Sequence, residues 1–176
     1  MREVSLAVLD IAMNAVDAGA KHVEINVEFD ANGLEFEVKD DGAGMDWATL
    51  VAAVQKGISF KGGAGLGLAL LKEETESTGG KIEIDSRLQV GTSVKATYCG
   101  SPEQVVIGNL GETFTALADT DYDLSLRICA FGTRKLYDTS GLKSSSDTAT
   151  TMPFGTLRSI REDINKFIRQ NGGAML

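Results

Sequence analysis

The glycine-rich segment Lys61–Lys72 is the part of this chain whose composition most directly suggests binding chemistry. Four glycines within residues 62–67 leave backbone N–H groups accessible, and the leucines and alanine that follow predict a helix beginning directly after the loop. Unpaired N–H groups at a helix N-terminus favour a phosphate. The spacing fits neither a Walker A loop nor the G-x-G-x-x-G dinucleotide fingerprint. The alternative is a connector that binds nothing.

Three polar residues share one stripe of the first predicted helix, residues 3–18. Asp10, Asn14 and Asp17 stand at positions i, i+4 and i+7, which places their side chains on one face. Such a stripe either lines a site or faces water, and a solvated face is the commoner case. Four larger apolar residues at helical spacing predict the core face: Leu6, Leu9, Met13 and Val16.

A cluster of acids and glycines follows the second predicted strand. The sequence Asp40-Asp41-Gly42-Ala43-Gly44 replaces the apolar alternation where the strand ends. A turn requires glycine, but a plain hairpin does not require the pattern D-x-G-x-G. The cluster is therefore a second candidate for a binding segment.

The elements that must position these segments follow from hydrophobic periodicity. Strands are predicted at residues 22–29, 34–38, 81–85, 92–98, 124–131 and 135–138. Helices are predicted at residues 3–18, 46–54, 66–77, 105–118 and 156–170. Hairpin-joined strands with helices between the pairs predict an α/β (α+β) two-layer sandwich, in which helices cover one face of a mixed, mostly antiparallel sheet. Residues 1–100 are predicted to form one domain and 101–176 a small C-terminal α/β extension, with a loose linker at 139–151.

Composition restricts the partners. The net charge of −8 argues against nucleic-acid and anionic-membrane surfaces, and an acidic protein needs a divalent cation to hold a polyphosphate. Cys99 and Cys129 do not make a disulfide framework. With no signal peptide or long apolar run visible, we expect a cytoplasmic location.

The three segments, taken in order, resemble the N, G1 and G2 boxes of the GHKL superfamily, whose ATP-binding domain is called the Bergerat fold. They are Asp10-x-x-x-Asn14, Asp40-x-Gly42-x-Gly44 and Gly63-x-Gly65-Leu66-Gly67-Leu68, followed by Gly91-Thr92. The superfamily includes DNA gyrase B subunits, Hsp90, histidine kinases and MutL. The resemblance covers Leu6–Tyr98, and from Gly63 onward it is closest to the catalytic domain of sensor histidine kinases.

The resemblance implies ATP and Mg²⁺ as cofactors and a base pocket around Asp40. That carboxylate would accept the adenine amino group, which guanine does not offer at this position. Gly42 and Gly44 would let the purine approach the backbone, and Thr92 is similar to the threonine that helps fix the base through water.

The resemblance also implies a phosphate and metal site. Asn14 would hold magnesium through its side-chain oxygen, Lys61 would lie near the γ-phosphate, and Met45–Gly62 would be a lid. The remaining nucleotide-binding residues implied in this way are Asp17, Met45, Gly63, Gly65, Leu66, Gly67 and Leu68.

Two departures from the family pattern affect the expected chemistry. Asp10 stands where hydrolytic members carry glutamate, and being one methylene shorter it reaches less far toward a water molecule. Histidine kinases phosphorylate a histidine on a separate helical domain, and this chain has one histidine, His22, which we expect to be an ordinary edge residue.

We therefore expect an ATP-binding protein that transfers the γ-phosphate to a separate partner protein, with Asp10 as the catalytic carboxylate. A slow ATPase or a nucleotide-dependent switch without phosphotransfer is the alternative. Residues 107–170 weakly resemble the C-terminal region of small stand-alone ATP-binding proteins associated with iron hydrogenase systems. The partner could accordingly be a phosphoacceptor or a regulated, hydrogenase-related complex.

Overall fold

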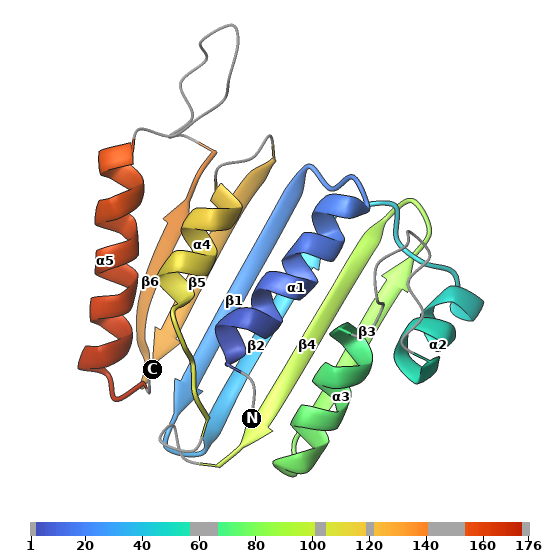
Figure 1. Cartoon of the computed structure of the whole chain (residues 1–176), viewed down its shortest axis with the longest axis horizontal. Helices are drawn as coiled ribbons and strands as arrows, with labels where there is room; N and C mark the ends of the chain where they lie inside the picture. Colours follow the sequence, from blue (N-terminus) through green and yellow to red (C-terminus); the bar gives the residue numbers. More distant parts are fainter. Residues whose placement is uncertain (1–2, 57–66, 101–104, 119–121, 141–153, 174–176) are drawn as a thin grey trace, which may run out of the picture.

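The computed structural model describes residues 3–56, 67–100, 105–118, 122–140 and 154–173 (Figure 1). The helices are α1 (Val4–Asp17), α2 (Trp47–Lys56), α3 (Gly67–Ser77), α4 (Leu110–Ala118) and α5 (Phe154–Gln170). The strands are β1 (His22–Asp30), β2 (Gly33–Asp40), β3 (Lys81–Arg87), β4 (Gly91–Cys99), β5 (Asp123–Ala130) and β6 (Thr133–Asp138).

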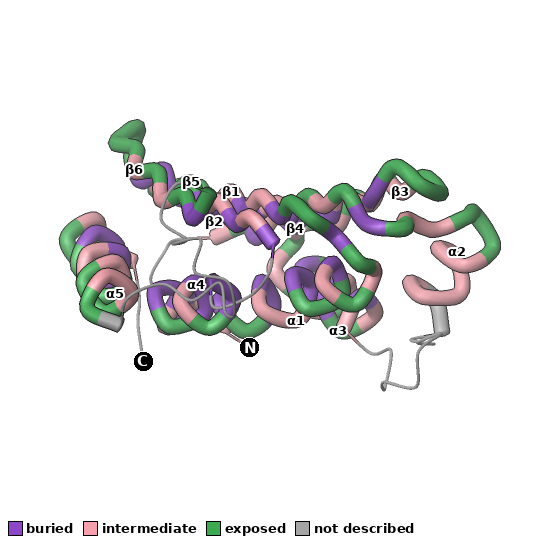
Figure 2. The backbone as a smooth tube through the Cα atoms, turned by 90° about the horizontal axis from the view of Figure 1, so that it is seen from above, coloured by how far each residue is buried: buried purple, intermediate pink, exposed green. Residues whose placement is uncertain are grey.

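The strands form one sheet in the order β3-β4-β2-β1-β5-β6. All neighbours are antiparallel except β1 and β5, which run parallel. Helices α1, α3, α4 and α5 lie together on one side of this sheet (Figure 2). The predicted two-layer α/β architecture with a mixed, mostly antiparallel sheet is confirmed.

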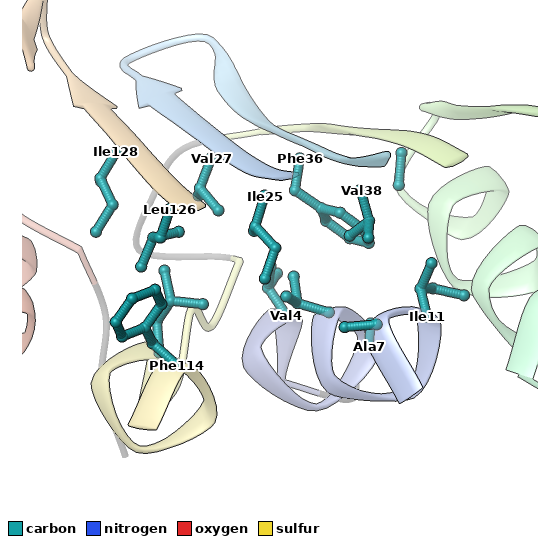
Figure 3. Close-up of a cluster of buried hydrophobic side chains, with 14 of the residues drawn as sticks. Val4, Ala7, Ile11, Ile25, Val27, Phe36, Val38, Phe114, Leu126 and Ile128 are labelled. Atoms are coloured by element: carbon teal, nitrogen blue, oxygen red, sulfur yellow. The ribbon is translucent and has the colours of Figure 1, made fainter. Parts of the chain in front are cut away.

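Period-two alternation in β1 and β2 sends one set of side chains toward the helices. Ile25, Phe36 and Val38 on this face are almost fully buried, and Figure 3 shows them pointing toward α1, with Ile25 directed toward Val4. Burying apolar surface on both layers is the main driving force for their association. The core therefore lies between the sheet and the helices.

The core face of α1 differs from the prediction. Leu6 and Met13 are 43% and 45% exposed, so assigning them to the core was wrong. Leu9 and Val16 are partly buried against the core. The large side chains of the sheet fill the space beneath α1, so the smaller helix residues approach it instead. The buried residues of α1 are Val4, Ser5, Ala7, Val8, Ile11, Ala12 and Ala15.

The segment before α4 is extended rather than helical. The predicted helix at 105–118 begins only at Leu110, because carbonyl groups of the preceding residues accept hydrogen bonds from the start of α1. Val4 donates its N–H to the Val106 carbonyl at 3.0 Å, and Ser5 donates to Ile107 at 2.8 Å. The first N–H groups of a helix lack partners within it, so these two carbonyls satisfy the start of α1.

The C-terminal strands extend the same sheet. Strand β5 lies beside β1, and the hairpin to β6 turns at Phe131 and Gly132, which both have positive φ. Of the predicted linker at 139–151, the structure describes Thr139 and Ser140. Thr139 is buried, and its hydroxyl accepts the Leu124 N–H at 2.9 Å. A domain boundary near residue 100 stays a prediction. No helix within the described ranges is long and apolar enough to span a membrane.

The face of the sheet away from the helices is covered by charged pairs. Lys95 lies 2.8 Å from Glu35, and Lys39 lies 3.0 Å from Glu37. The hydrogen bond with Glu35 raises the pKa of Lys95 above its usual range, despite the opposing effect of burial. These pairs are exposed to water, so they contribute little to stability but keep this face solvated.

An ionic cluster attaches α5 to β6. Both carboxylate oxygens of Asp163 lie 2.7 Å from Lys135 Nζ, and the Tyr137 hydroxyl donates to Asp163 at 2.8 Å. Hydrogen bonding by Lys135, and then by Tyr137, lowers the pKa of Asp163. Burial, followed by the Asp163 hydrogen bond, raises the pKa of the Tyr137 hydroxyl. The carboxylate form of Asp163 is thus the form that the fold favours.

Asp163→Asn should destabilise the protein at neutral pH but not in acid. The pKa of Asp163 is lowered on folding, so its contribution is present above the unfolded pKa and disappears as the pH falls through the folded pKa. The cluster is partly exposed, so we expect a loss of about 1 kcal/mol, or about 2–4 °C in Tm. Thermal melting from pH 7 to pH 2.5 tests this, with Glu28→Gln on the open face as the matched control. A Tm difference independent of pH would contradict it.

Candidate functional site

Strand β2 ends at a half-buried carboxylate, Asp40, on the helix-facing side of the sheet. Its Oδ1 accepts the Gly42 N–H at 2.8 Å, which bends the chain back as the strand ends. Burial raises the pKa of Asp40, an effect that the N–H groups of Gly42 and Thr92 oppose and the neighbouring Asp41 reinforces. A carboxylate desolvated in this way is a strong acceptor for a ligand donor that reaches it.

Three strands bring polar residues into one row beside this carboxylate. Asp40 of β2 is paired with Thr92 of β4, and Thr92 is paired with Ser86 of β3. The next row along the same face is apolar and consists of Val38, Val94 and Ile84. A face that changes from apolar to polar at one end has the lining that a ligand with both kinds of surface would fit.

The two glycines of the D-x-G-x-G pattern also have reasons within the fold. A Cβ on Gly42 would lie 2.9 Å from both the Ala18 Cβ and the Asp40 Oδ1. Gly44 has φ +63°, and a Cβ there would collide with the Arg87 carbonyl. The close approach of Gly42 to Ala18 keeps the loop against the C-terminal end of α1, where Ala43 donates its N–H to the Ala18 carbonyl at 3.0 Å. Gly44 keeps it against the end of β3.

One residue of the predicted polar stripe of α1, Asp10, lies beside the start of α3. Asp10 is partly buried, whereas Asn14 and Asp17 are exposed. A Cβ on Gly67, the first residue of α3, would lie 3.8 Å from Asp10 Oδ2. The structure therefore brings the start of the helix that follows the glycine-rich loop close to Asp10.

The rest of the predicted phosphate loop is only partly visible. Leu68 is buried in the core, so its backbone is the part available to a ligand. Met45 donates its N–H to the Ser86 hydroxyl at 2.8 Å. Four predicted residues lie outside the described residues: Lys61, Gly63, Gly65 and Leu66. The predicted lid, Met45–Gly62, is described as far as residue 56, where α2 ends.

Sequence reasoning missed Ser86. Its hydroxyl lies 2.9 Å from the Thr92 hydroxyl and accepts the Met45 N–H, so it joins two predicted site segments. The alternation of Ile82, Ile84 and Ser86 was the available signal, because it places Ser86 on the inward face of an otherwise apolar set.

His22 is the first residue of β1, the strand that flanks β2 on the side opposite to β4. Its Nδ1 is 3.5 Å from Asp123 Oδ2, and its Nε2 is 3.9 Å from Asp41 Oδ2. Asp41 also accepts the N–H groups of Lys21 and His22. Two carboxylates beside one imidazole would repel a phosphoryl group. That His22 is not a phosphoacceptor stays a prediction, and this repulsion gives the prediction a physical basis.

Within the described part of the chain there is no group of three or more His, Cys, Asp or Glu side chains that could hold a metal ion. Asn14 lies one turn beyond Asp10 on α1 and is exposed. An amide oxygen here suits a cation whose other ligands are phosphate oxygens and water, as Mg²⁺ prefers.

Comparison with known proteins gives a family match over this region. The family model described as "Histidine kinase-, DNA gyrase B-, and HSP90-like ATPase" matches residues 2–100. The sensor histidine kinase YvrG of Bacillus subtilis (strain 168) is 37% identical over 93 residues, which are 48% of this chain and 16% of the relative. The sensor histidine kinase DcuS of Escherichia coli (strain K12) is 35% identical over 65 residues, 36% of this chain and 12% of the relative. The chain thus spans less than a fifth of the length of these relatives.

A solved structure has the same fold. The N-terminal domain of a DNA repair protein matches with a TM-score of 0.56 and 14% identity, covering 99% of this chain and 58% of that chain. The mycobacterial sensor histidine kinase MprB matches with a TM-score of 0.44 and 24% identity, covering 54% of this chain and 68% of that chain. The first likeness extends over the C-terminal strands as well, and at this identity it concerns the fold alone.

Proposed function

Because the chain belongs to the family of histidine kinase-, DNA gyrase B- and HSP90-like ATPases, and carries a histidine-kinase-like ATP-binding domain, we propose that it transfers the γ-phosphate of Mg-ATP to a separate partner protein. The observation that carries the proposal is the position of Asp10 against the first residue of α3. A carboxylate close to the terminal phosphate can accept the proton of the attacking nucleophile. The setting is a bacterial regulatory system in the cytoplasm.

In this proposal each polar segment has a separate task. Asp40 accepts the adenine amino group, Thr92 fixes the base, and the N–H groups at the start of α3 hold the phosphates. Asn14 would hold Mg²⁺, which neutralises the charge of the phosphates when bound. A nucleophilic side chain of the partner attacks the γ-phosphorus, the bond to the β,γ-bridging oxygen breaks and ADP leaves. Asp10 accepts the proton released by the nucleophile.

The function is tested by following the γ-phosphate of labelled ATP. The protein is incubated with Mg-ATP, with and without extract of its source cells, and free phosphate and labelled protein are scored separately. We expect a labelled partner to appear only with the extract, and little free phosphate without it. Rapid release of free phosphate by the chain alone would favour the ATPase or switch function instead.

Asp40→Asn should lose most of the affinity for ATP without unfolding the protein. A charge-assisted hydrogen bond to the adenine amine is worth about 1.5–3 kcal/mol, or roughly 10- to 150-fold in Kd. Burial raises the pKa of Asp40, so its ionisation opposes folding as the pH rises through the folded pKa. Asparagine removes this cost, although its side chain has one acceptor oxygen fewer than the carboxylate. The Tm at pH 7 should therefore stay within a few degrees of the wild-type value.

Calorimetric titration with Mg-ATP and Mg-GTP measures the effect. Asp41→Asn is the matched control, because Asp41 uses its carboxylate for the N–H groups of Lys21 and His22. Equal ATP affinity in wild type and Asp40→Asn would refute the base pocket.

Asn14→Ala should weaken ATP binding more in magnesium than in chelator, because the lost contact runs through the metal. We expect about a tenfold loss with Mg²⁺ and little change with EDTA, the equivalent of roughly one hydrogen bond to a charged group. Asn26→Ala, on the open face of the sheet, is the control. An equal loss in both conditions would mean that Asn14 acts through packing.

A further inference from the structure

Ser86 continues the row of polar residues formed by Asp40 and Thr92, and it comes from a third strand. The pairing of β2, β4 and β3 places the three residues next to one another on the helix-facing side of the sheet. Ser86 is partly buried, whereas its chain neighbours Asp85 and Arg87 are exposed. A hydroxyl at this inward position is unlike the isoleucines that precede it on the same face.

The Ser86 hydroxyl connects the two walls of the base pocket. It accepts the N–H of Met45, the residue that follows the D-x-G-x-G pattern, at 2.8 Å. It also lies 2.9 Å from the Thr92 hydroxyl and 3.4 Å from the Gly91 carbonyl. One side chain therefore fixes both the end of the loop from β2 and the side chain at the start of β4.

Building on the proposed function, we propose that Ser86 is a positioning residue for adenine recognition, which orients the Thr92 hydroxyl toward the nucleotide. A serine hydroxyl has one proton and two acceptor lone pairs. One lone pair of Ser86 is used by Met45. Its proton has a shorter path to Thr92 than to the Gly91 carbonyl. When Ser86 donates to Thr92, the proton of Thr92 is left for the base or its bound water.

This arrangement makes Ser86 act through Thr92 rather than by touching the ligand. Ser86→Ala leaves the Thr92 hydroxyl free to rotate, whereas the Met45 N–H, at a partly buried position, can bond to water instead. We expect ATP affinity to fall about three- to tenfold, which corresponds to the loss of one neutral hydrogen bond. Binding of GTP, which does not use the adenine contacts, should change less, so the preference for ATP over GTP should narrow. Ser86→Thr keeps the hydroxyl and should restore both values.

A double-variant cycle tests the coupling on the full chain by calorimetry with Mg-ATP and Mg-GTP. The expected result is that Ser86→Ala combined with Thr92→Val binds ATP no more weakly than Thr92→Val alone. Ser93→Ala is the matched control, because Ser93 lies on the open face and donates to Glu37 at 3.1 Å. All variants are first compared with the wild type by thermal melting.

Two results would overturn the inference. One is that the factors by which Ser86→Ala and Thr92→Val each weaken ATP binding multiply in the double variant. The other is that Ser86→Ala lowers ATP and GTP affinity by the same factor, as a general loss of folded protein would. Full ATP affinity in Asp40→Asn is a different failure, because it would refute the base pocket and hence the proposed function itself.

Discussion

Phosphotransfer to the partner should fall by about 10²–10⁴-fold in Asp10→Ala, the range that a positioned general base contributes. The carboxylate lies beside the first residue of α3, where the phosphates are proposed to bind. ATP affinity should change far less, because Asp10 is proposed to act on the proton of the nucleophile. Single-turnover transfer of labelled phosphate, measured together with the Kd of Mg-ATP, separates the two effects. A parallel loss of affinity and transfer would mean that Asp10 serves binding alone.

Asp10→Glu gives the complementary result. Aspartate is one methylene shorter than the glutamate of hydrolytic members of the superfamily, which withdraws its oxygens by roughly 1 Å. A misplacement of this size can cost about a hundredfold in rate. We therefore expect the wild-type chain to hydrolyse ATP very slowly and Asp10→Glu to hydrolyse it faster. Unchanged hydrolysis in Asp10→Glu, with transfer lost in Asp10→Ala, would assign the carboxylate to the partner's nucleophile alone.

Gly91→Ala should destabilise the protein by about 3–5 kcal/mol and abolish ATP binding at ordinary concentrations. Gly91 has φ +130°, a conformation that other residues rarely adopt, and a Cβ there would collide with the Asp40 carbonyl. Relief of this collision would push the start of β4 away from the end of β2. Asp40 and Thr92, which are paired across these strands, would then separate. Urea denaturation and Mg-ATP titration measure the two losses.

Gly79→Ala is the matched control for this variant. Gly79 also has a positive φ, +79°, but nothing lies within 4 Å of the position that a Cβ would take. It should therefore show only the cost of an unfavourable backbone conformation, about 1–2 kcal/mol, and retain ATP binding. Equal destabilisation by the two variants would mean that the contact with Asp40 does not determine the effect.

The hairpins and their order along the chain could be predicted because each hairpin depends on local sequence signals. Alternation over 22–29 and 34–38 determined which side chains face the helices. The parallel pairing of β1 with β5 was not foreseen, because no local pattern specifies which edge of a sheet a distant strand joins. Leu6 and Met13 do not face the core, although they are large and apolar, because the space beneath α1 fits smaller side chains. Small residues such as Ala7 and Ala12 face the sheet, where Ile25 and Phe36 already fill the space.

Two pairs of predicted site residues lie next to each other in the structure. Asp40 and Thr92 are brought together by strand pairing, and Asp10 meets Gly67. Ser86 was missed because a single serine in a strand carries no motif, and its partners become visible only through register. The glycines at 42 and 44 were attributed to the approach of a purine, yet their closest contacts are with α1 and the Arg87 carbonyl. The sequence shows where such a glycine stands. It does not show which neighbouring atoms would collide with a side chain at that position.

The place of β5 in the sheet has a consequence for the nascent chain. Strand β1 is synthesised before β5, the strand that covers its second edge and is encoded about a hundred residues later. Until residues 123–130 leave the ribosome, β1 would present unpaired N–H and C=O groups next to strongly apolar side chains. Such an edge is a template for pairing with other chains. Aggregation during expression should therefore concentrate in products that terminate before β5.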